Sequence, residues 1–239
     1  MNGDFICYAH RGASEYCPEN TLVSFYTGIC LGANGIETDV RLTKDGVPVL
    51  FHDSTLKRLA GVDIPVAELT FDELQKYTFV KNGITDKIVS LDTFLRLFAF
   101  RDIKFAIELK APGVEEKTAE LIEKYGIRDK CVVTSFDFDK VRRMKELLPE
   151  VEIGLLVRDL SPEALRDLKE IGGTELCPNA ETLTPEETAE LHKAGFRVRA
   201  WGVKTEALML HALACGADGM TVNFPDKLVK LMKNENDQN

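Results

Sequence analysis

The chain has 239 residues, of which 44% are hydrophobic and 29% charged, and this is enough to bury one substantial core. The composition excludes a collagen, a disordered tail protein and a small domain held together by disulfides. With 30 basic and 39 acidic residues the net charge is −9, which repels nucleic acid and anionic membranes. An anionic small substrate therefore needs a local cation, from arginine or from a metal.

Strand-like and helix-like segments alternate along the chain. The apolar patterning predicts strands over residues 5–10, 35–41, 103–110, 131–136, 152–157, 175–178, 196–202 and 218–223. It predicts helices over residues 18–31, 91–100, 115–125, 138–148, 162–171, 185–194, 206–214 and 225–233. Eight units of strand followed by helix indicate an α/β fold, a TIM (β/α)8 barrel, with a doubly wound open sheet as the alternative.

One stretch interrupts this alternation. Residues 43–88, roughly, separate the second expected strand from the next long helix and are too many for an ordinary loop. They begin with the turn signal Thr43–Gly46 and an extended run, and this pattern predicts a hairpin. Further along, Thr70 and Glu73 have the spacing of a capping box, which predicts the start of a short helix. We expect a single barrel domain over residues 1–239, with this segment as a small insertion on the catalytic face.

The N-terminus and the cysteines favour a cytoplasmic protein. The first residues lack the basic and apolar regions of a signal peptide, and no apolar run reaches the ~18 residues of a membrane span. The six cysteines are scattered without a C-x-x-C pair, and Cys7 and Cys131 lie in apolar strand-like runs. We therefore expect reduced core thiols rather than redox or zinc chemistry, and no insertion into a membrane.

Two of the expected strands carry charged faces. Side chains alternate along a strand, so Glu37, Asp39 and Arg41 share one side, as do Glu108 and Lys110 on the next barrel strand. These faces should look into the barrel mouth, where carboxylates are costly unless something neutralises them. Three converging carboxylates describe a site for a hard cation, Mg²⁺ or Ca²⁺. A buried network of acids with lysine and arginine is the alternative.

Two of the four histidines stand where barrel enzymes place catalytic groups. His10 ends the first strand in the run His10-Arg11-Gly12, and His52 follows the hairpin strand. His192 and His211 lie on helical segments and are expected to be solvated or packed. Glycine permits a tight turn with exposed N–H groups, and the Arg11 guanidinium matches the oxygens of a phosphate.

The front of the chain thus offers two imidazoles, one guanidinium and three acids. A cation and Arg11 would neutralise phosphate oxygens, while one histidine removes a proton and the other protonates the departing oxygen. Imidazoles suit both roles because their pKa lies near working pH. The residues therefore indicate metal-assisted phosphoryl transfer.

Taken together, these motifs resemble those of the glycerophosphodiester phosphodiesterase family. The match is dense from His10 to about Phe100 and continues thinly to Phe224-Pro225-Asp226, so it covers nearly the whole chain. The motifs, in the order and approximate spacing of the family, are His10-Arg11-Gly12, Pro18-Glu19-Asn20-Thr21, Glu37-Thr38-Asp39-Val40, Thr43-Lys44-Asp45-Gly46, His52-Asp53 and Glu108-Leu109-Lys110. The family has a TIM barrel with a small insertion after the second strand.

This resemblance implies metal-dependent hydrolysis of a small glycerophosphodiester to sn-glycerol 3-phosphate and an alcohol. It implies Glu37, Asp39 and Glu108 as ligands of a divalent cation, usually Mg²⁺ or Ca²⁺, and His10 and His52 as the acid/base pair. Which histidine acts first as base stays open. So does the nucleophile, because either the glycerol 2-hydroxyl attacks to form a cyclic phosphate or water attacks directly.

The resemblance also implies substrate contacts. Arg11 would bind the phosphate and Lys110 would lie beside the substrate, while Trp201 could wall its glycerol or simply pack in the barrel. Arg199, on the same strand face as Trp201, could be a second anion contact or an ion-paired residue.

The chain departs from the family pattern at two positions. Asn223 stands where relatives commonly have Asp, and Gly202 stands where they have Thr. The asparagine keeps a hydrogen-bonding side chain without the charge. These departures motivate one alternative, a noncatalytic phosphodiester-binding protein on the same barrel. A second alternative keeps the chemistry but changes the substrate to another diester, such as a phosphoinositide or lysophospholipid. The head group, the cellular metal and the oligomeric state are not encoded in these motifs.

Overall fold

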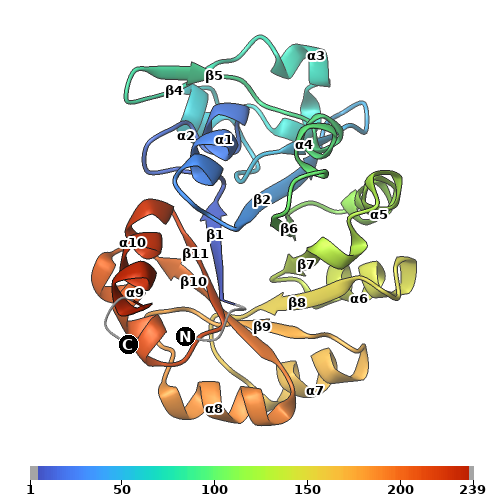
Figure 1. The fold of residues 1–239 in the computed structure, drawn as a ribbon. Helices are drawn as coiled ribbons and strands as arrows, with labels where there is room; N and C mark the ends of the chain where they lie inside the picture. The colour runs from blue at the N-terminus through green and yellow to red at the C-terminus, as the bar shows by residue number, and fades with distance from the viewer. Residues whose placement is uncertain (1–4, 237–239) are drawn as a thin grey trace.

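A computed structural model describes residues 5–236 of the chain, and its centre is a closed parallel barrel (Figure 1). The sheet order β1-β11-β10-β9-β8-β7-β6-β2 closes because β1 also pairs with β2. This closure confirms the TIM barrel and rules out the open sheet. The eight barrel strands found in this range are β1 Ile6–His10, β2 Gly35–Leu42, β6 Lys104–Leu109, β7 Cys131–Ser135, β8 Glu152–Leu156, β9 Glu175–Cys177, β10 Arg197–Val203 and β11 Gly219–Val222.

On the outside of the barrel, one helix follows each barrel strand in the chain. These helices are α1 Leu22–Cys30, α4 Leu91–Phe98, α5 Val114–Tyr125, α6 Phe138–Leu147, α7 Pro162–Glu170, α8 Pro185–Ala194, α9 Glu206–Ala214 and α10 Pro225–Asn236, with a 3-10 turn η2 at Arg128–Lys130. Ser161 and Thr184 cap α7 and α8 ahead of a proline, as their sequences predict.

The first helix begins later than the sequence predicts. We expected it to start at Pro18, but it starts at Leu22, with the Thr21 side chain accepting a hydrogen bond from the Ser24 N–H. The cause is Asn20, whose φ of 56° is left-handed and cannot continue a right-handed helix. The side chain of Asn20 instead donates to Asp39 Oδ2 at 2.9 Å. These residues therefore form a loop over the barrel mouth.

The segment between β2 and α4 carries short elements of its own. They are β3 Pro48–Leu50, α2 Lys57–Ala60, the 3-10 turn η1 Val66–Glu68, α3 Phe71–Leu74, β4 Phe79–Lys81 and β5 Ile84–Asp86. Strand β3 pairs antiparallel with β2, and Thr70 and Glu73 form the capping box of α3, which confirms the predicted hairpin and helix start. Figure 1 shows these elements gathered beside α1 and α4 at one side of the barrel.

Apolar residues on the outer face of the barrel pack against the helices. In β6, for example, Phe105, Ile107 and Leu109 belong to the main apolar core, while Ala106 packs with Tyr8 inside the barrel. The alternation leaves Glu108 facing the interior. Within residues 5–236, no helix combines the length and the apolar character needed to cross a membrane.

Candidate active site

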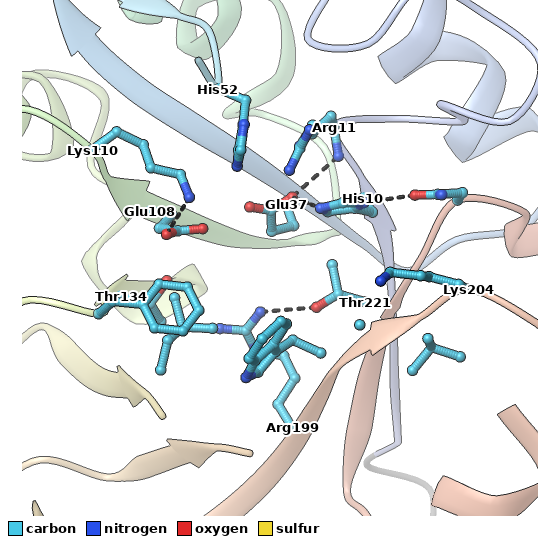
Figure 2. A pocket seen from close by; sticks show the side chains of 16 residues that line it. His10, Arg11, Glu37, His52, Glu108, Lys110, Thr134, Arg199, Lys204 and Thr221 are labelled. Carbon is cyan, nitrogen blue, oxygen red and sulfur yellow. Dashed lines mark hydrogen bonds and ion pairs between the residues drawn. The ribbon is translucent and has the colours of Figure 1, made fainter. Parts of the chain in front are cut away.

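A pocket of about 220 Å³ lies where the barrel strands end at their carboxyl side. This is the face on which TIM barrels carry their active sites. The side chains that surround it come from seven of the barrel strands, from the segment after β3 and from the loops that follow the strands (Figure 2). They are His10, Arg11, Glu37, His52, Glu108, Lys110, Thr134, Phe136, Leu156, Arg199, Trp201, Gly202, Val203, Lys204, Thr221 and Asn223.

Three buried acids form a cluster at this pocket, which we call the acidic cluster. Glu37 and Asp39 lie two residues apart on β2, and Asp39 is in direct register with Glu108 on the neighbouring strand β6. Each offers an oxygen within 4.8 Å of the others. The strand alternation and the pairing of β2 with β6 together explain this convergence.

Two cations from neighbouring segments contact the acidic cluster. Arg11 Nε lies 3.0 Å from Asp39 Oδ2, and Lys110 Nζ lies 3.4 Å from Asp39 Oδ1 and 2.5 Å from Glu108 Oε1. The backbone N–H of Arg11 donates to Glu37 Oε2 at 3.1 Å. The ion pairs that the sequence left as an alternative are therefore present, yet Glu37 and Glu108 still line an open pocket.

The acidic cluster fits a hard divalent cation. Burial and the charges of Asp39 and Glu108 raise the pKa of Glu37 to about 8, so the negative charge is not fully compensated by protein groups. Asp39 Oδ1 is buried and makes no hydrogen bond within residues 5–236. Oxygens this close can meet around an ion at the ~2.0–2.6 Å distances of Mg²⁺ or Ca²⁺. The donor set, all carboxylate, is the one such ions prefer.

The loop after β1 holds Arg11 in a fixed position. Arg11 itself has a left-handed φ of 55°, and a Cβ on the following Gly12 would lie 2.4 Å from the Ser24 backbone, so the turn requires glycine there. The guanidinium of Arg11 also pairs with Glu19 at 2.9 Å, and Arg58 of the inserted segment pairs with the same carboxylate at 2.7 Å. The insertion and the β1–α1 loop are thereby linked at the pocket edge.

His10 is anchored from the opposite end of the chain. Its Nδ1 lies 2.6 Å from Asn223 Oδ1, which also accepts a hydrogen bond from the Ser14 hydroxyl at 2.9 Å. Its Nε2 faces the acidic cluster, 3.9 Å from Glu37 Oε2. Burial and the charge of Arg11 lower the pKa of His10 to about 4, so the ring is neutral at pH 7.

His52 is held by a carboxylate instead of an amide. Its Nδ1 lies 2.7 Å from Asp53 Oδ1, and Asp53 in turn pairs with Arg58 at 2.6 Å. Arg41 donates two hydrogen bonds to the His52 carbonyl, at 2.9 and 2.7 Å, which fixes the backbone after β3. Burial lowers the pKa of His52, with Arg11 adding to the effect and Asp39 opposing it.

The wall opposite the acids is largely apolar. The rings of Phe136 and Trp201 meet edge to face, with centroids 5.2 Å apart and planes at 87°. The indole Nε1 of Trp201 donates to the Val157 carbonyl at 3.0 Å, which fixes the ring at the pocket. Gly202 follows with a left-handed φ of 76°, a conformation that a β-branched side chain would strain.

Arg199 lies at the floor of the pocket in a buried network of its own. Its Nε donates to Glu175 Oε1 at 2.8 Å, its Nη1 to Thr221 Oγ1 at 3.0 Å and its Nη2 to Cys177 Sγ at 3.3 Å. We call Glu175, Cys177, Arg199 and Thr221 the Arg199 cluster. The ion-paired alternative thus describes Arg199, which still lines the pocket.

The pocket contains all but one of the predicted site residues. Asp39 lies just behind it, in contact with Arg11 and Lys110. The other two histidines lie elsewhere, His192 against Asp218 and His211 against the Leu183 carbonyl.

The sequence prediction missed several pocket residues. Two of these, Thr134 and Phe136, come at or just beyond the end of β7, and strand ends on the catalytic face were the signal that could have found them. The others are Leu156, Val203, Lys204 and Thr221, again at the carboxyl ends of strands.

A closed barrel with carboxylates, imidazoles and an arginine at its catalytic mouth defines a class of protein, the TIM-barrel enzymes whose site suits a metal ion and an anionic substrate. Comparison with known families gives the particular member of that class. The model of the Glycerophosphoryl diester phosphodiesterase family matches residues 10–227, so the chain belongs to this family.

Individual relatives agree with this assignment along the whole chain. A "Glycerophosphodiester phosphodiesterase" of Bacillus altitudinis is 33% identical, over 94% of this chain and 96% of its own. One of Caldanaerobacter subterraneus is 31% identical, over 95% and 98%. An Oleispira antarctica phosphodiesterase, solved in complex with the product sn-glycerol-3-phosphate, has the same fold with a TM-score of 0.85 at 24% identity, over 95% and 96%.

Proposed function

We propose that the protein hydrolyses glycerophosphodiesters to sn-glycerol 3-phosphate and an alcohol, with a divalent cation, Mg²⁺ or Ca²⁺, at the acidic cluster. The observation that carries this proposal is the meeting of His10, His52, Arg11 and the acidic cluster at one pocket of a chain in this family. Relatives with this enzyme name, and the glycerol phosphate bound in the Oleispira antarctica protein, support the choice of substrate.

The phosphate would be bound by the positive groups beside the acidic cluster. The bound cation, held by Glu37, Asp39 and Glu108, would neutralise phosphate oxygens and the charge that develops on them. Arg11 offers the remaining N–H groups of its guanidinium, and Lys110 offers its ammonium at the pocket edge. Both side chains are already fixed by carboxylates, so little reorganisation is needed when the substrate binds.

We infer from their partners that the two histidines have different roles. Burial and the charge of Arg11 keep the His10 ring neutral even though the Asn223 amide oxygen accepts from its Nδ1–H, so Nε2 keeps a lone pair toward the pocket and acts as base. His52 is paired with a carboxylate, Asp53, which favours its protonated form against the burial that lowers its pKa, so of the two rings it is the better suited to act as acid. His10 then takes the proton of the attacking hydroxyl, the bond from phosphorus to the alcohol oxygen breaks, and His52 protonates that oxygen.

Two nucleophiles satisfy this scheme. If the glycerol 2-hydroxyl attacks, a cyclic phosphate forms and is opened by water, whereas direct attack by water gives glycerol 3-phosphate in one step. Phosphorus NMR during turnover separates the two routes, because only the first passes through a cyclic phosphate. Trp201, together with Phe136, would wall the carbon chain of the substrate in either case.

The first experiment measures release of sn-glycerol 3-phosphate from glycerophosphocholine. We expect turnover with Mg²⁺ or Ca²⁺, its loss in EDTA and its recovery when the cation is restored. His10→Ala and His52→Ala should each lower the rate by about 10²–10⁴-fold, because each removes one proton-transfer group. His192→Ala is the matched control, since His192 is half-exposed and paired with Asp218 outside the pocket.

Three results would contradict the proposal. Binding of the diester without turnover across several cations would indicate the noncatalytic alternative. Undiminished activity in both the His10 and the His52 variants would remove the acid/base assignment. If only a lysophospholipid or a phosphoinositide is hydrolysed, the proposed substrate is wrong and the enzyme acts on that other phosphodiester.

We also propose a cytoplasmic setting for this activity. All six cysteines are free thiols, and five of them are buried, an arrangement that a reducing compartment maintains. The net charge of −9 disfavours a nucleic-acid partner, which leaves a small-molecule diester as the expected partner in glycerol and lipid metabolism.

A further inference from the structure

Two buried threonine hydroxyls make no hydrogen bond within residues 5–236, those of Thr118 and Thr134. Both residues are almost fully buried, at 0% and 1% exposure. Thr118 lies on α5, outside the pocket, whereas Thr134 lies on β7 and lines the active-site pocket. A buried hydroxyl without a hydrogen-bond partner destabilises the folded protein. Where such a hydroxyl borders a cavity, it therefore indicates a ligand that supplies the missing hydrogen bond.

The neighbouring strands fix the orientation of Thr134. Its Cα is in register with Glu108 on β6 and with Gly154 on β8. A Cβ built on Gly154 would lie 2.9 Å from the Thr134 methyl group, so the glycine leaves the space that this methyl occupies. Because β-branched side chains are stiff at χ1, the methyl contact also fixes the direction of the hydroxyl.

Thr134 lies away from Arg11, whose guanidinium would bind the phosphate. Figure 2 shows it on the far side of Glu108 from Arg11 and His52, in the same part of the pocket as Arg199. The side chains next to it in this part of the wall include Phe136, a ring that offers no hydrogen-bonding group. A ligand segment here must therefore have carbon to pack on the apolar wall and a hydroxyl for Thr134.

Thr134 and Thr221 supply the hydroxyl groups of this pocket wall, and their situations differ. Thr221 already accepts a hydrogen bond from Arg199 Nη1 at 3.0 Å. The hydroxyl of Thr134 is free both to donate and to accept, as is an alcohol hydroxyl of the ligand. The two groups match as partners.

We propose that Thr134 is a specificity-determining residue that hydrogen-bonds a free hydroxyl of the substrate's glycerol moiety. This inference rests on the proposed function for the identity of the substrate. It assigns the part of the pocket bounded by Thr134, Phe136 and Trp201 to the glycerol carbons, and the part beside Arg11 to the phosphate, with Lys110 between them, its Nζ 5.8 Å from the Phe136 ring centroid. A site built to pair with a hydroxyl discriminates against a ligand that lacks it.

The test compares two ligands that differ only in hydroxyl groups. Calorimetric titration with sn-glycerol 3-phosphate and with propyl phosphate, both in Mg²⁺, measures binding to wild type, Thr134→Val, Thr134→Ser and Thr118→Val. We expect Thr134→Val to bind glycerol phosphate about tenfold more weakly, as for one lost hydrogen bond, and propyl phosphate as wild type does. Thr134→Ser keeps a hydroxyl, so it should bind glycerol phosphate more tightly than propyl phosphate, as wild type does. Thr118→Val removes an equally buried unpaired hydroxyl outside the pocket and should bind both ligands as wild type does.

Other outcomes separate this inference from the proposed function. If Thr134→Val binds both ligands as wild type does, or loses both equally, Thr134 does not recognise glycerol and the inference is wrong. If glycerophosphocholine is not hydrolysed but Thr134→Val still loses only glycerol phosphate, the proposed reaction fails while the binding role stands. Thermal melting of each variant checks folding, and Thr134→Ser keeps the test available if the valine variant does not fold.

Discussion

The acidic cluster and the Arg199 cluster are both groups of buried charges inside one barrel, yet they differ in balance. In the Arg199 cluster one carboxylate, Glu175, lies 2.8 Å from Arg199 Nε and 4.0 Å from Arg197 Nη2, and Arg199 donates further hydrogen bonds to Thr221 and Cys177. In the acidic cluster three carboxylates share two cations, Arg11 and Lys110, and Arg11 is also engaged by Glu19. The first is a structural ion pair, whereas the second keeps an excess of negative charge next to a cavity.

This difference shows how the same residue types serve stability at one place and ligand binding at another. A balanced buried pair is retained because breaking it leaves an isolated charge. An unbalanced group of acids raises the energy of the metal-free protein, and a cation relieves it. The raised pKa of Glu37, caused by burial and by its two acidic neighbours, is the electrostatic sign of that excess.

The largest expected effect comes from neutralising one acid of the acidic cluster. Glu37→Gln should lower kcat/KM for glycerophosphocholine by about 10³-fold or more, because one ligand of the cation and its charge are lost. The metal-free variant should melt no lower than wild type, since glutamine replaces a carboxyl that is largely protonated at pH 7. Steady-state kinetics and thermal melting in EDTA measure the two effects, and a variant that retains full activity would place the cation elsewhere.

The opposite pattern is expected for the Arg199 cluster. Glu175→Gln leaves the Arg199 guanidinium buried without its counter-charge, which should cost about 3 kcal/mol of unfolding free energy. Denaturant unfolding measures this loss. The activity of the remaining folded protein should fall far less than in Glu37→Gln, because Glu175 does not line the active-site pocket. Equal losses of activity in the two variants would erase the distinction between the clusters.

Strand alternation was enough to predict the acidic cluster, because Glu37 and Asp39 share a face whatever the neighbouring strand is. The balance of charges was not predictable, since it depends on register between distant segments. Arg199 meets Glu175 from 24 residues away on the adjacent strand. Similarly, Thr134 stands in an apolar run and becomes a pocket residue only once β7 lies in register beside Glu108.

Local backbone conformation was a second source of error. The pattern Pro18 to Thr21 has the composition of a helix start, but Asn20 takes a left-handed conformation and reaches Asp39 across the barrel mouth. Its side chain binds the acidic cluster, and this long-range contact outweighs the local preference. Predictions from sequence were therefore accurate for periodic elements and weaker where a loop residue serves the site.

The smallest expected effect that distinguishes the two clusters is the number of protons released when Mg²⁺ binds. Because its pKa is raised to about 8, the carboxyl of Glu37 is mostly protonated in metal-free molecules at pH 7, and a cation binds only the deprotonated form. Binding of Mg²⁺ should therefore release more protons at pH 7 than at pH 9, and affinity should rise with pH over this range. Calorimetry in buffers of different ionisation enthalpy counts these protons. The Glu37→Gln variant lacks this titrating carboxyl, so binding of Mg²⁺ to that variant should release no proton from position 37. If the wild type releases almost no protons at pH 7, the acidic cluster is already charge-balanced like the Arg199 cluster.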